Sequence, residues 1–323
     1  MNQFSQGHIE VFPIVIPVSN TLKSVNFYLV KQGRRLSLID AGFNNEECWQ
    51  ALQTVLQHNG FQLRDLTEIL LTHHHVDHVG LVDRIVAEHS VPVYAHARSV
   101  VRLKRDETFL KMRAEFFKRL YEEMGCGELG SKQVENMRNA MKRNKGLKIQ
   151  SEIITLPEHS ILDFEIIEIP GHAHDQVAFY HRESKWLLAG DLLMEHLSPL
   201  AFVEPDFNGN RMKTLVQHIE SLQKCLPLQT TSVFSGHGGI IKDSDSLIEK
   251  RLNRIEEKAN QFLSLIAVGV STAHDIARMI HKEKYEKQFY NIITDVIGYL
   301  DYLEEQGKIQ KKSVRGVYHY YVN

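Results

Sequence analysis

The sequence predicts a mixed α/β protein in which two packed sheets carry helices on their outer faces. Strand patterns alternate with helix patterns through two strand-rich halves of the chain, which is typical of layered α/β folds. Several histidines and aspartates directly follow apolar strands, where ligand side chains are usually found. The chain has 323 residues, of which 43% are hydrophobic, so it can bury a sizeable core.

The first half is expected to contain strands that lead into a histidine cluster. Short segments that are rich in β-branched residues or that alternate in polarity predict strands, whereas Asn44 and Asn45 cap a helix that ends at Gly60. The expected strands are 11–18, 24–31, 36–40, 68–72 and 91–95, and a second helix covers 79–89.

A helical insertion is expected at 97–146, between the two halves. Phe109, Met112, Phe116 and Leu120 recur there at helical spacing. The insertion contains 13 Lys or Arg and 7 Asp or Glu residues, although the whole chain has a net charge of −2. This positive surplus suits a small-molecule substrate with an anionic group, and the alternative is a helical layer whose cations are only solvated.

The second half repeats the strand pattern and ends in a different arrangement. Strands are expected at 152–156, 162–169, 176–181, 186–189 and up to Ser235, and helices at 211–226 and along the amphipathic stretch from Ile248 to Ile266. The last segment then reads as a helix at 272–281, a helix at 288–306 and a β-ribbon with strands at 309–310 and 316–322.

The composition indicates the cellular compartment of the protein and excludes some classes of partner. The three cysteines, Cys48, Cys126 and Cys225, form no CxxC pair, so neither a disulfide framework nor a cysteine zinc site is indicated. The first residues lack the basic start and apolar run of a signal peptide. No stretch is long enough to span a membrane. We therefore expect a cytoplasmic protein without a membrane partner, and a net charge of −2 argues against nucleic acid as the general partner.

The strongest motif is His73-His74-His75-Val76-Asp77-His78, which has the pattern His-x-His-x-Asp-His. It follows a buried strand and precedes a helix, so alternate side chains can surround one point. Imidazole and carboxylate groups are suitable ligands for zinc and similar cations. The motif therefore predicts a metal site.

Further ligands must come from later in the chain, because one cluster cannot complete two metal shells. Three candidates follow apolar strands: His172 after Pro170-Gly171, Asp191 after Gly190, and His237 after Gly236. Each alone is more typical of a turn, but their order and spacing behind the first motif favour a shared site.

With these motifs the sequence resembles the metallo-β-lactamase superfamily over roughly residues 8–260. Asp40-Ala41-Gly42 matches the family's early Asp-x-Gly element. The resemblance implies an αββα sandwich with a domain at 1–265, and an additional winged-helix-like domain at 266–323. It also implies a metal-ligand set, in which one ion is held by His73, His75 and His172, a second by Asp77, His78 and His237, with Asp191 bridging both and Asp40 orienting the ligands.

The same resemblance implies a metallohydrolase with two divalent ions, most naturally zinc, although iron or manganese would also suit the ligands. A shared hydroxide would attack the substrate, and Asp77 is the candidate catalytic residue that orients it or relays its proton. Because the histidine spacing resembles that of glyoxalase II-like enzymes, the leading function is hydrolysis of a small ester, thioester or lactone. The alternative is a metal-dependent endoribonuclease or phosphodiesterase.

Three features are left open by the sequence. His174 and His196 follow ligand candidates and could line the pocket or serve as ordinary loop histidines. The C-terminal segment resembles a tail found on endoribonuclease relatives, but its second helix carries Asp295, Asp301, Glu304 and Glu305, which does not favour nucleic acid. The apolar face of that helix would suit packing or an oligomer interface.

Overall fold

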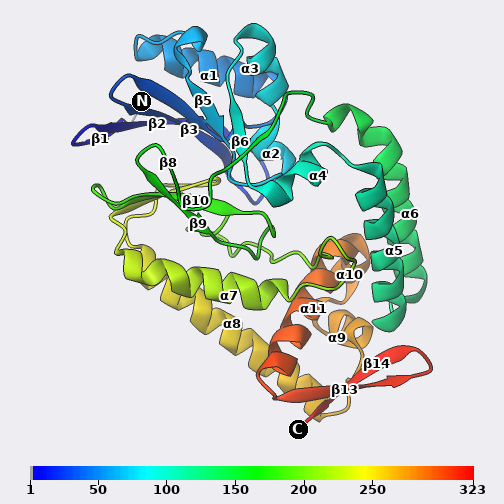
Figure 1. The fold of residues 1–323 in the computed structure, drawn as a ribbon. Coiled ribbons are helices and arrows are strands. Elements are labelled where there is room, and N and C mark those ends of the chain that lie inside the picture. Colours follow the sequence, from blue (N-terminus) through cyan, green and yellow to red (C-terminus); the bar gives the residue numbers. More distant parts are fainter. Residues whose placement is uncertain (1–2) are drawn as a thin grey trace. The chain divides into compact units, whose positions relative to one another are not determined.

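The structure, a computed structural model of the chain, describes residues 3–323 and contains two large sheets and a small ribbon (Figure 1). The chain forms two compact units. The first extends to Lys104 and also contains Leu147–Pro199 and Ser221–Ile248. The second contains Arg105–Gly146, Leu200–Glu220 and Glu249–Asn323. The prediction of a mixed α/β fold with helices outside two sheets is confirmed.

The first sheet contains seven strands in chain order, β1 to β7. Neighbouring strands are antiparallel from β1 to β4 and parallel from β4 to β7. The strands are β1 (Phe4–Gln6), β2 (Ile9–Pro17), β3 (Ser24–Gln32), β4 (Arg35–Ile39), β5 (Glu68–Leu70), β6 (Val93–Ala95) and β7 (Ile154–Thr155).

The second sheet contains five strands in the order β12, β11, β10, β9 and β8. β12 lies parallel to β11, and the other neighbours are antiparallel. The strands are β8 (Ser160–Ile161), β9 (Phe164–Glu168), β10 (Val177–His181), β11 (Trp186–Gly190) and β12 (Ser232–Ser235). The sequence did not predict β1 or β8, because both are short and lack a clear apolar alternation.

The inner strand β3 of the first sheet is buried on both faces, which explains its apolar composition. Phe27 and Leu29 point to a cluster that includes Trp49 and Leu52 of α1 (Glu46–His58). Tyr28 lies in a different cluster, which it shares with residues of the second sheet. Because side chains alternate along a strand, β3 supplies both layers, and a sheet covered on both sides needs apolar residues on each.

Helices of the first unit cover the outer face of the first sheet (Figure 1). The Asn45 side chain accepts a hydrogen bond from the Cys48 amide at 2.9 Å, so it caps α1 as the sequence predicted. The helix expected at 79–89 forms as α3 over residues 82–88, and a separate short helix, α2, precedes it at 76–79. The remaining helical elements here are α2 (Val76–Val79), α3 (Val82–Glu88), α4 (Val100–Leu103), and the 3₁₀ turns Leu63–Asp65, Ala97–Ser99 and Leu226–Leu228.

Two long helices contribute residues to both units: α7 (Thr214–Cys225) and α8 (Ser244–Ala267). In the first unit, the Ser221 hydroxyl donates to the Pro170 carbonyl at 2.7 Å, and the Lys224 ammonium donates to the Glu168 carbonyl at 2.7 Å. These bonds attach the end of α7 to the segment that follows β9, where His172 lies.

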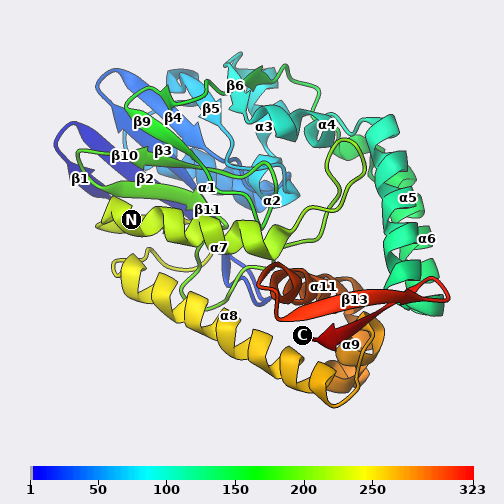
Figure 2. The same cartoon turned by 60° about the horizontal axis from the view of Figure 1, so that its bottom comes forward.

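The second unit joins the expected insertion to the C-terminal segment. One hydrophobic cluster contains Phe117 and Tyr121 of α5 together with Phe289 and Ile293 of α11. Figure 2 shows the ribbon of β13 and β14 beside α9 and α11. The elements are α5 (Glu107–Glu123), α6 (Gly127–Arg143), the 3₁₀ turn Asn144–Leu147, α9 (Ala273–His281), α10 (Glu283–Lys287), α11 (Phe289–Glu305), β13 (Ile309–Val314) and β14 (Val317–Val322).

Segments from both sides of residue 266 pack together in the second unit, and the domain boundary expected at residue 266 stays a prediction. Periodicity along the chain shows which face of a helix is apolar, but it does not show which distant helix covers that face. The ring centroids of Tyr121 and Phe289 lie 5.2 Å apart, although the residues are far apart in sequence. The order of helix, helix and ribbon agrees with the sequence pattern, and the winged-helix-like character of residues 266–323 stays a prediction. Among the described residues, every helix is too short or too polar to cross a membrane.

A buried ion pair lies within the second unit. Asp301 of α11 is 1% exposed, and its carboxylate lies 2.9 Å from the Arg211 guanidinium. Burial raises the pKa of Asp301 to about 6, even though Arg211 and Lys311 oppose the shift. The folded state therefore holds a proton on Asp301 more tightly than the unfolded chain does.

This difference predicts that Asp301 makes the protein less stable as pH rises from about 4 to about 6. Over that window the folded state binds more protons than the unfolded state, so the free energy of unfolding falls with pH. An Asp301→Asn variant cannot titrate and lacks this fall. We expect the free energy of unfolding of this variant, measured in urea, to rise relative to that of the wild type by up to about 3 kcal/mol across the window. A difference that stays constant with pH would contradict the assignment.

Candidate metal centre

The predicted ligands come together because four segments end at one edge of the two sheets. His73 and His75 follow β5, and Asp77 and His78 lie in the short helix α2. The other three follow strands of the second sheet: His172 lies after β9, Asp191 directly after β11 and His237 after β12. The structure thus brings all seven sequence-predicted ligand residues to one place.

The donor atoms form three overlapping groups, and within each group they lie within 4.8 Å of one another. The groups are His73, His75 and His172; His73, His78 and Asp191; and Asp77, His78 and His237. In the first group, Nδ1 of His75 lies 3.0 Å from Nε2 of His73 and 3.0 Å from Nε2 of His172. Nitrogen atoms at this spacing match the edges of a metal coordination shell, since zinc–nitrogen bonds are about 2 Å long.

Asp191 lies between the histidine groups. One carboxylate oxygen is 3.4 Å from Nε2 of His172 and 3.2 Å from Nε2 of His237. The other oxygen is 3.3 Å from Nε2 of His78. A single carboxylate thus contacts nitrogens of both sets that the sequence assigned to separate ions.

Two buried atoms at the centre fit a cation. Among the described residues, neither Nε2 of His78 nor Oδ1 of Asp191 has a hydrogen-bond partner. A buried polar atom without a partner is costly, and a cation would satisfy both atoms at once. The donor set of imidazoles and carboxylates also matches divalent transition metals. The residues present therefore fit one or two such ions.

Neighbouring groups fix the tautomers of two ligand histidines. Nδ1 of His237 lies 2.7 Å from the Ser24 carbonyl, which can only accept, so this nitrogen carries the hydrogen. Nδ1 of His78 lies 2.8 Å from the Asp40 carboxylate. In the neutral form of each ring, which is the form that binds a metal, Nε2 carries the lone pair and faces the centre. This is the usual arrangement around ligand histidines in metalloproteins.

Asp40 also organises the loop that carries the first ligands. Its carboxylate accepts hydrogen bonds from the Thr72 amide and hydroxyl, each at 2.8 Å. Its backbone has φ of 59°, a left-handed conformation that aspartate tolerates better than most residues. Thr72, which the sequence analysis missed, in turn lies 3.0 Å from Nδ1 of His73. Only the folded chain could reveal this role, because a threonine before a histidine carries no motif.

The surroundings shift the pKa values of the histidines and of Asp191 at the centre in different directions. Burial lowers the pKa of His73 and His75 well below the usual value, which favours the neutral imidazole that binds metals. Burial also opposes charge on His78, but the Asp191 and Asp40 carboxylates raise its pKa well above the usual value. For Asp191, burial is likewise outweighed, here by His78 and His237, which keep its pKa well below the usual range.

Glycines next to the ligands allow the strands to approach closely. A Cβ atom at Gly236 would lie 2.3 Å from Oδ1 of Asp191 and 2.6 Å from Cε1 of His78. A Cβ atom at Gly190 would lie 2.7 Å from the Thr72 hydroxyl. The Gly-Asp and Gly-His pairs of the sequence are thus required by packing at the centre.

The remaining histidines lie around the centre in different settings. Nδ1 of His74 is 2.7 Å from the buried Asp175 carboxylate, which also accepts from the Ser99 hydroxyl at 2.5 Å. His174 is buried, with Nδ1 at 3.7 Å from Asp175. Nε2 of His196 lies 3.0 Å from the Thr21 carbonyl. Asp175, which was not a candidate, therefore links the loop of the first motif to the loop of His172.

Comparison with known proteins agrees with this geometry. The model of the metallo-beta-lactamase superfamily matches residues 20–237. This chain belongs to the metallo-β-lactamase superfamily. A relative from Bacillus subtilis (strain 168), the probable metallo-hydrolase YqjP, is 30% identical over 302 residues, covering 93% of this chain and 94% of its own. A crystal structure of a metallo-β-lactamase family protein from Thermus thermophilus has a TM-score of 0.76 and 25% identity, covering 97% and 98% of the two chains.

Two further relatives are named as a hydroxyacylglutathione hydrolase and a thioesterase. A hydroxyacylglutathione hydrolase of Bdellovibrio bacteriovorus is 26% identical over 129 residues, which cover 40% of this chain and 35% of the relative. An atrochrysone carboxyl ACP thioesterase of Pseudocercospora fijiensis is 21% identical over 247 residues, covering 76% of this chain and 57% of the relative. The predicted metal-dependent hydrolase of the metallo-β-lactamase fold is confirmed at the level of the superfamily.

Removing the Asp40 side chain should weaken metal binding without removing a ligand. An Asp40→Ala variant frees Nδ1 of His78 to change tautomer, and loss of such a supporting group typically costs about 10- to 100-fold in metal affinity. Competition with a chelator measures this affinity. Asp245→Ala, at an exposed position of α8, is the control and should match the wild type. Equal affinity in both variants would remove Asp40 from this role.

A methyl group at position 236 should disturb the centre directly. Gly236→Ala places a carbon against Asp191 and His78, so one of them must move. We expect a loss of about 1–3 kcal/mol in the free energy of unfolding, together with reduced metal content after purification. Gly146→Ala is the control, since nothing lies within 4 Å of its Cβ position. Unchanged metal content in Gly236→Ala would show that the centre tolerates displacement.

Proposed function

We propose that this protein is a metal-dependent acyl hydrolase that cleaves a small thioester, ester or lactone. The observation that carries the proposal is the position of the Asp191 carboxylate, of which one oxygen lies 3.4 Å from Nε2 of His172 and 3.2 Å from Nε2 of His237. A carboxylate shared in this way suits two adjacent ions. The named activities of the hydroxyacylglutathione hydrolase and thioesterase relatives support acyl substrates.

The proposed ligand assignment follows the three groups of donor atoms. His73, His75 and His172 would hold one ion, and Asp77, His78 and His237 a second, with Asp191 between them. Zinc is the proposed metal because the donor set is rich in imidazole. When bound, such ions lower the pKa of water and polarise a carbonyl oxygen.

Two aspartates at the centre would have different roles in hydrolysis: Asp77 in proton transfer and Asp40 in orienting a histidine. Asp77 is the most exposed of the carboxylates at the centre, with 16% side-chain exposure against 5% for Asp191. Its carboxylate lies 3.5 Å from Nε2 of His237. From there it would accept a proton from the attacking water and return it to the departing thiolate or alkoxide. Asp40 would hold His78 in the tautomer that presents Nε2.

The substrate is proposed to be a small molecule, and an anionic group on it would suit the positive surplus of residues 97–146. The location is proposed to be the cytoplasm. The alternative of an endoribonuclease requires that the C-terminal segment bind nucleic acid. Its second helix, α11, instead buries Phe289, Ile293 and Asp301 in its own unit, so acyl hydrolysis is the better supported function.

A substrate panel tests the proposal. Metal-loaded protein is assayed with a hydroxyacyl glutathione thioester, an acyl lactone, a phosphodiester and single-stranded RNA. We expect turnover of the thioester or lactone, and a loss of about 100-fold or more in kcat/KM for Asp77→Asn, the size of a missing proton-transfer group. Chelation of the metal should abolish turnover in the wild type.

Asp245→Asn serves as the matched control, because it makes the same chemical change at an exposed position. It should retain the activity of the wild type. Cleavage of RNA or the phosphodiester alone would replace the acyl hydrolase with the alternative. Equal activity of Asp77→Asn and Asp245→Asn would remove Asp77 from the catalytic role.

A further inference from the structure

A second group of metal-binding side chains lies away from the proposed catalytic centre. It is formed by three turns: His8 lies between β1 and β2, Asp163 between β8 and β9, and His181 ends β10 just before Glu183. His172 precedes β10 and His181 ends it, so the two groups lie at opposite ends of this strand. With a rise of about 3.3 Å per residue, the five residues of β10 separate them by roughly 15 Å.

The geometry of this group resembles a coordination shell. One ring nitrogen each of His8 and His181 and one oxygen of Asp163 lie within 4.8 Å of one another. Nε2 of His8 is 3.2 Å from Oδ2 of Asp163. Neighbouring ligands of a tetrahedral zinc ion are about 3.3 Å apart, as follows from bond lengths near 2 Å.

Glu183 supports His8 from the other side of its ring. Its carboxylate lies 3.5 Å from Nδ1 of His8. A hydrogen on Nδ1 would point to this carboxylate and leave the lone pair of Nε2 for a cation. Metal-bound histidines commonly have such a carboxylate behind them.

His181 is the buried member of the group, with 3% exposure. Its Nδ1 lies 2.8 Å from the Ser184 hydroxyl and 3.2 Å from the Ser184 amide nitrogen. Because the amide can only donate, Nδ1 accepts when no cation is bound and the ring hydrogen lies on Nε2. A cation at Nε2 would replace that hydrogen, and a hydrogen on Nδ1 would then be donated to the Ser184 hydroxyl, the shorter contact.

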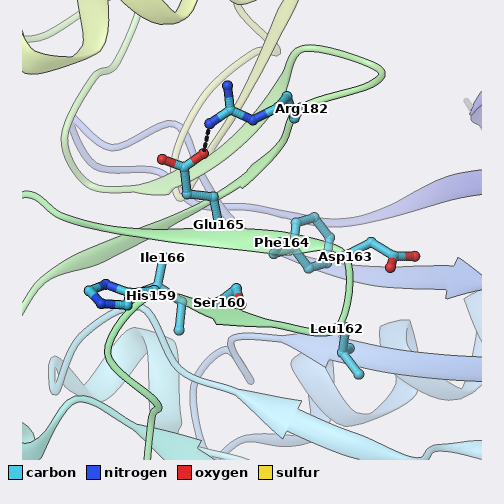
Figure 3. Close-up of a pocket in the computed structure, with 8 residues that line it drawn as sticks. All are labelled: His159, Ser160, Leu162, Asp163, Phe164, Glu165, Ile166 and Arg182. Atoms are coloured by element: carbon cyan, nitrogen blue, oxygen red, sulfur yellow. Dashed lines mark hydrogen bonds and ion pairs between the residues drawn. The ribbon is translucent and has the colours of Figure 1, made fainter.

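The nearby Arg182 guanidinium does not pair with the proposed ligand Asp163. Arg182 belongs to the same turn as Glu183 but pairs with Glu165 of β9 (Figure 3). Figure 3 also shows Asp163 beside Leu162 in the β8–β9 turn, with the Asp163 carboxylate directed away from Glu165. Asp163 is therefore left to His8, at 3.2 Å.

We propose that His8, Asp163 and His181 bind a divalent transition-metal cation, best matched by zinc, at a structural site separate from the catalytic centre. Two imidazoles and one carboxylate suit zinc with water as the fourth ligand. His8 lies in a turn between two strands of the first sheet, whereas Asp163 lies in a turn of the second sheet and His181 ends its strand β10. The cation would therefore join the two sheets at the edge opposite the catalytic centre, and bound metal would stabilise the folded chain.

The proposal is tested by measuring the zinc content of the protein, which requires no substrate. The full chain is dialysed against buffered zinc, and zinc per chain is determined by atomic emission. We expect the wild type to bind one equivalent more than His8→Ala or Asp163→Ala, while hydrolytic activity is retained in both variants. Zinc should also raise the melting temperature of the wild type more than that of either variant. Ser184→Ala should weaken this extra equivalent about 10-fold through loss of the supporting contact.

His159→Ala is the matched control. Its side chain is 84% exposed and directly precedes β8, in the same hairpin as Asp163, but it is outside the proposed ligand set. This variant should bind as much zinc as the wild type. Equal zinc content in the wild type, His8→Ala and Asp163→Ala would overturn the site. A loss of the same size in His159→Ala would reduce it to nonspecific binding by surface histidines.

Discussion

The Asp191 carboxylate is buried between two groups of histidines, and much of the first unit serves to hold it there. An ionised carboxylate away from water is costly unless charges or hydrogen bonds compensate. Here the nitrogens of His78, His172 and His237 lie between 3.2 and 3.4 Å from its oxygens. Each of those histidines comes from a different segment, so the compensation requires that several strands end at one place.

The two-sheet architecture satisfies that requirement. Parallel strands β4, β5 and β6 deliver the first motif at one sheet edge, and the parallel pair β11 and β12 delivers Asp191 and His237 from the other sheet. Between them, Tyr28, Phe179 and Phe234 fill the space with apolar side chains. The core thus acts as a rigid support, and the Gly236 backbone allows the two sets of ligands to approach.

Residues that do not belong to the predicted ligand set hold the histidines of the centre in place. Asp40 contacts His78 and Thr72, whereas Ser24 contacts His237 through its carbonyl. These contacts determine which ring nitrogen faces the centre, and loss of such a supporting group typically costs about 10- to 100-fold in metal affinity. The proposed second site uses the same device, with Glu183 behind His8 and Ser184 behind His181. At both the metal centre and the proposed second site, a hydrogen-bond partner behind these histidines therefore orients their rings.

The sequence alone determined the layered α/β fold, most strands, and the residues that meet at the centre. It could do so because strand alternation and the His-x-His-x-Asp-His pattern are local, and because each later ligand directly follows an apolar strand. It did not identify Asp175, Thr72 or Ser24, since a supporting residue has no spacing of its own. Nor did it join α5 to α11, because helix periodicity marks an apolar face without naming its partner. The tertiary structure decided these pairings, since burial and packing depend on residues that are distant along the chain.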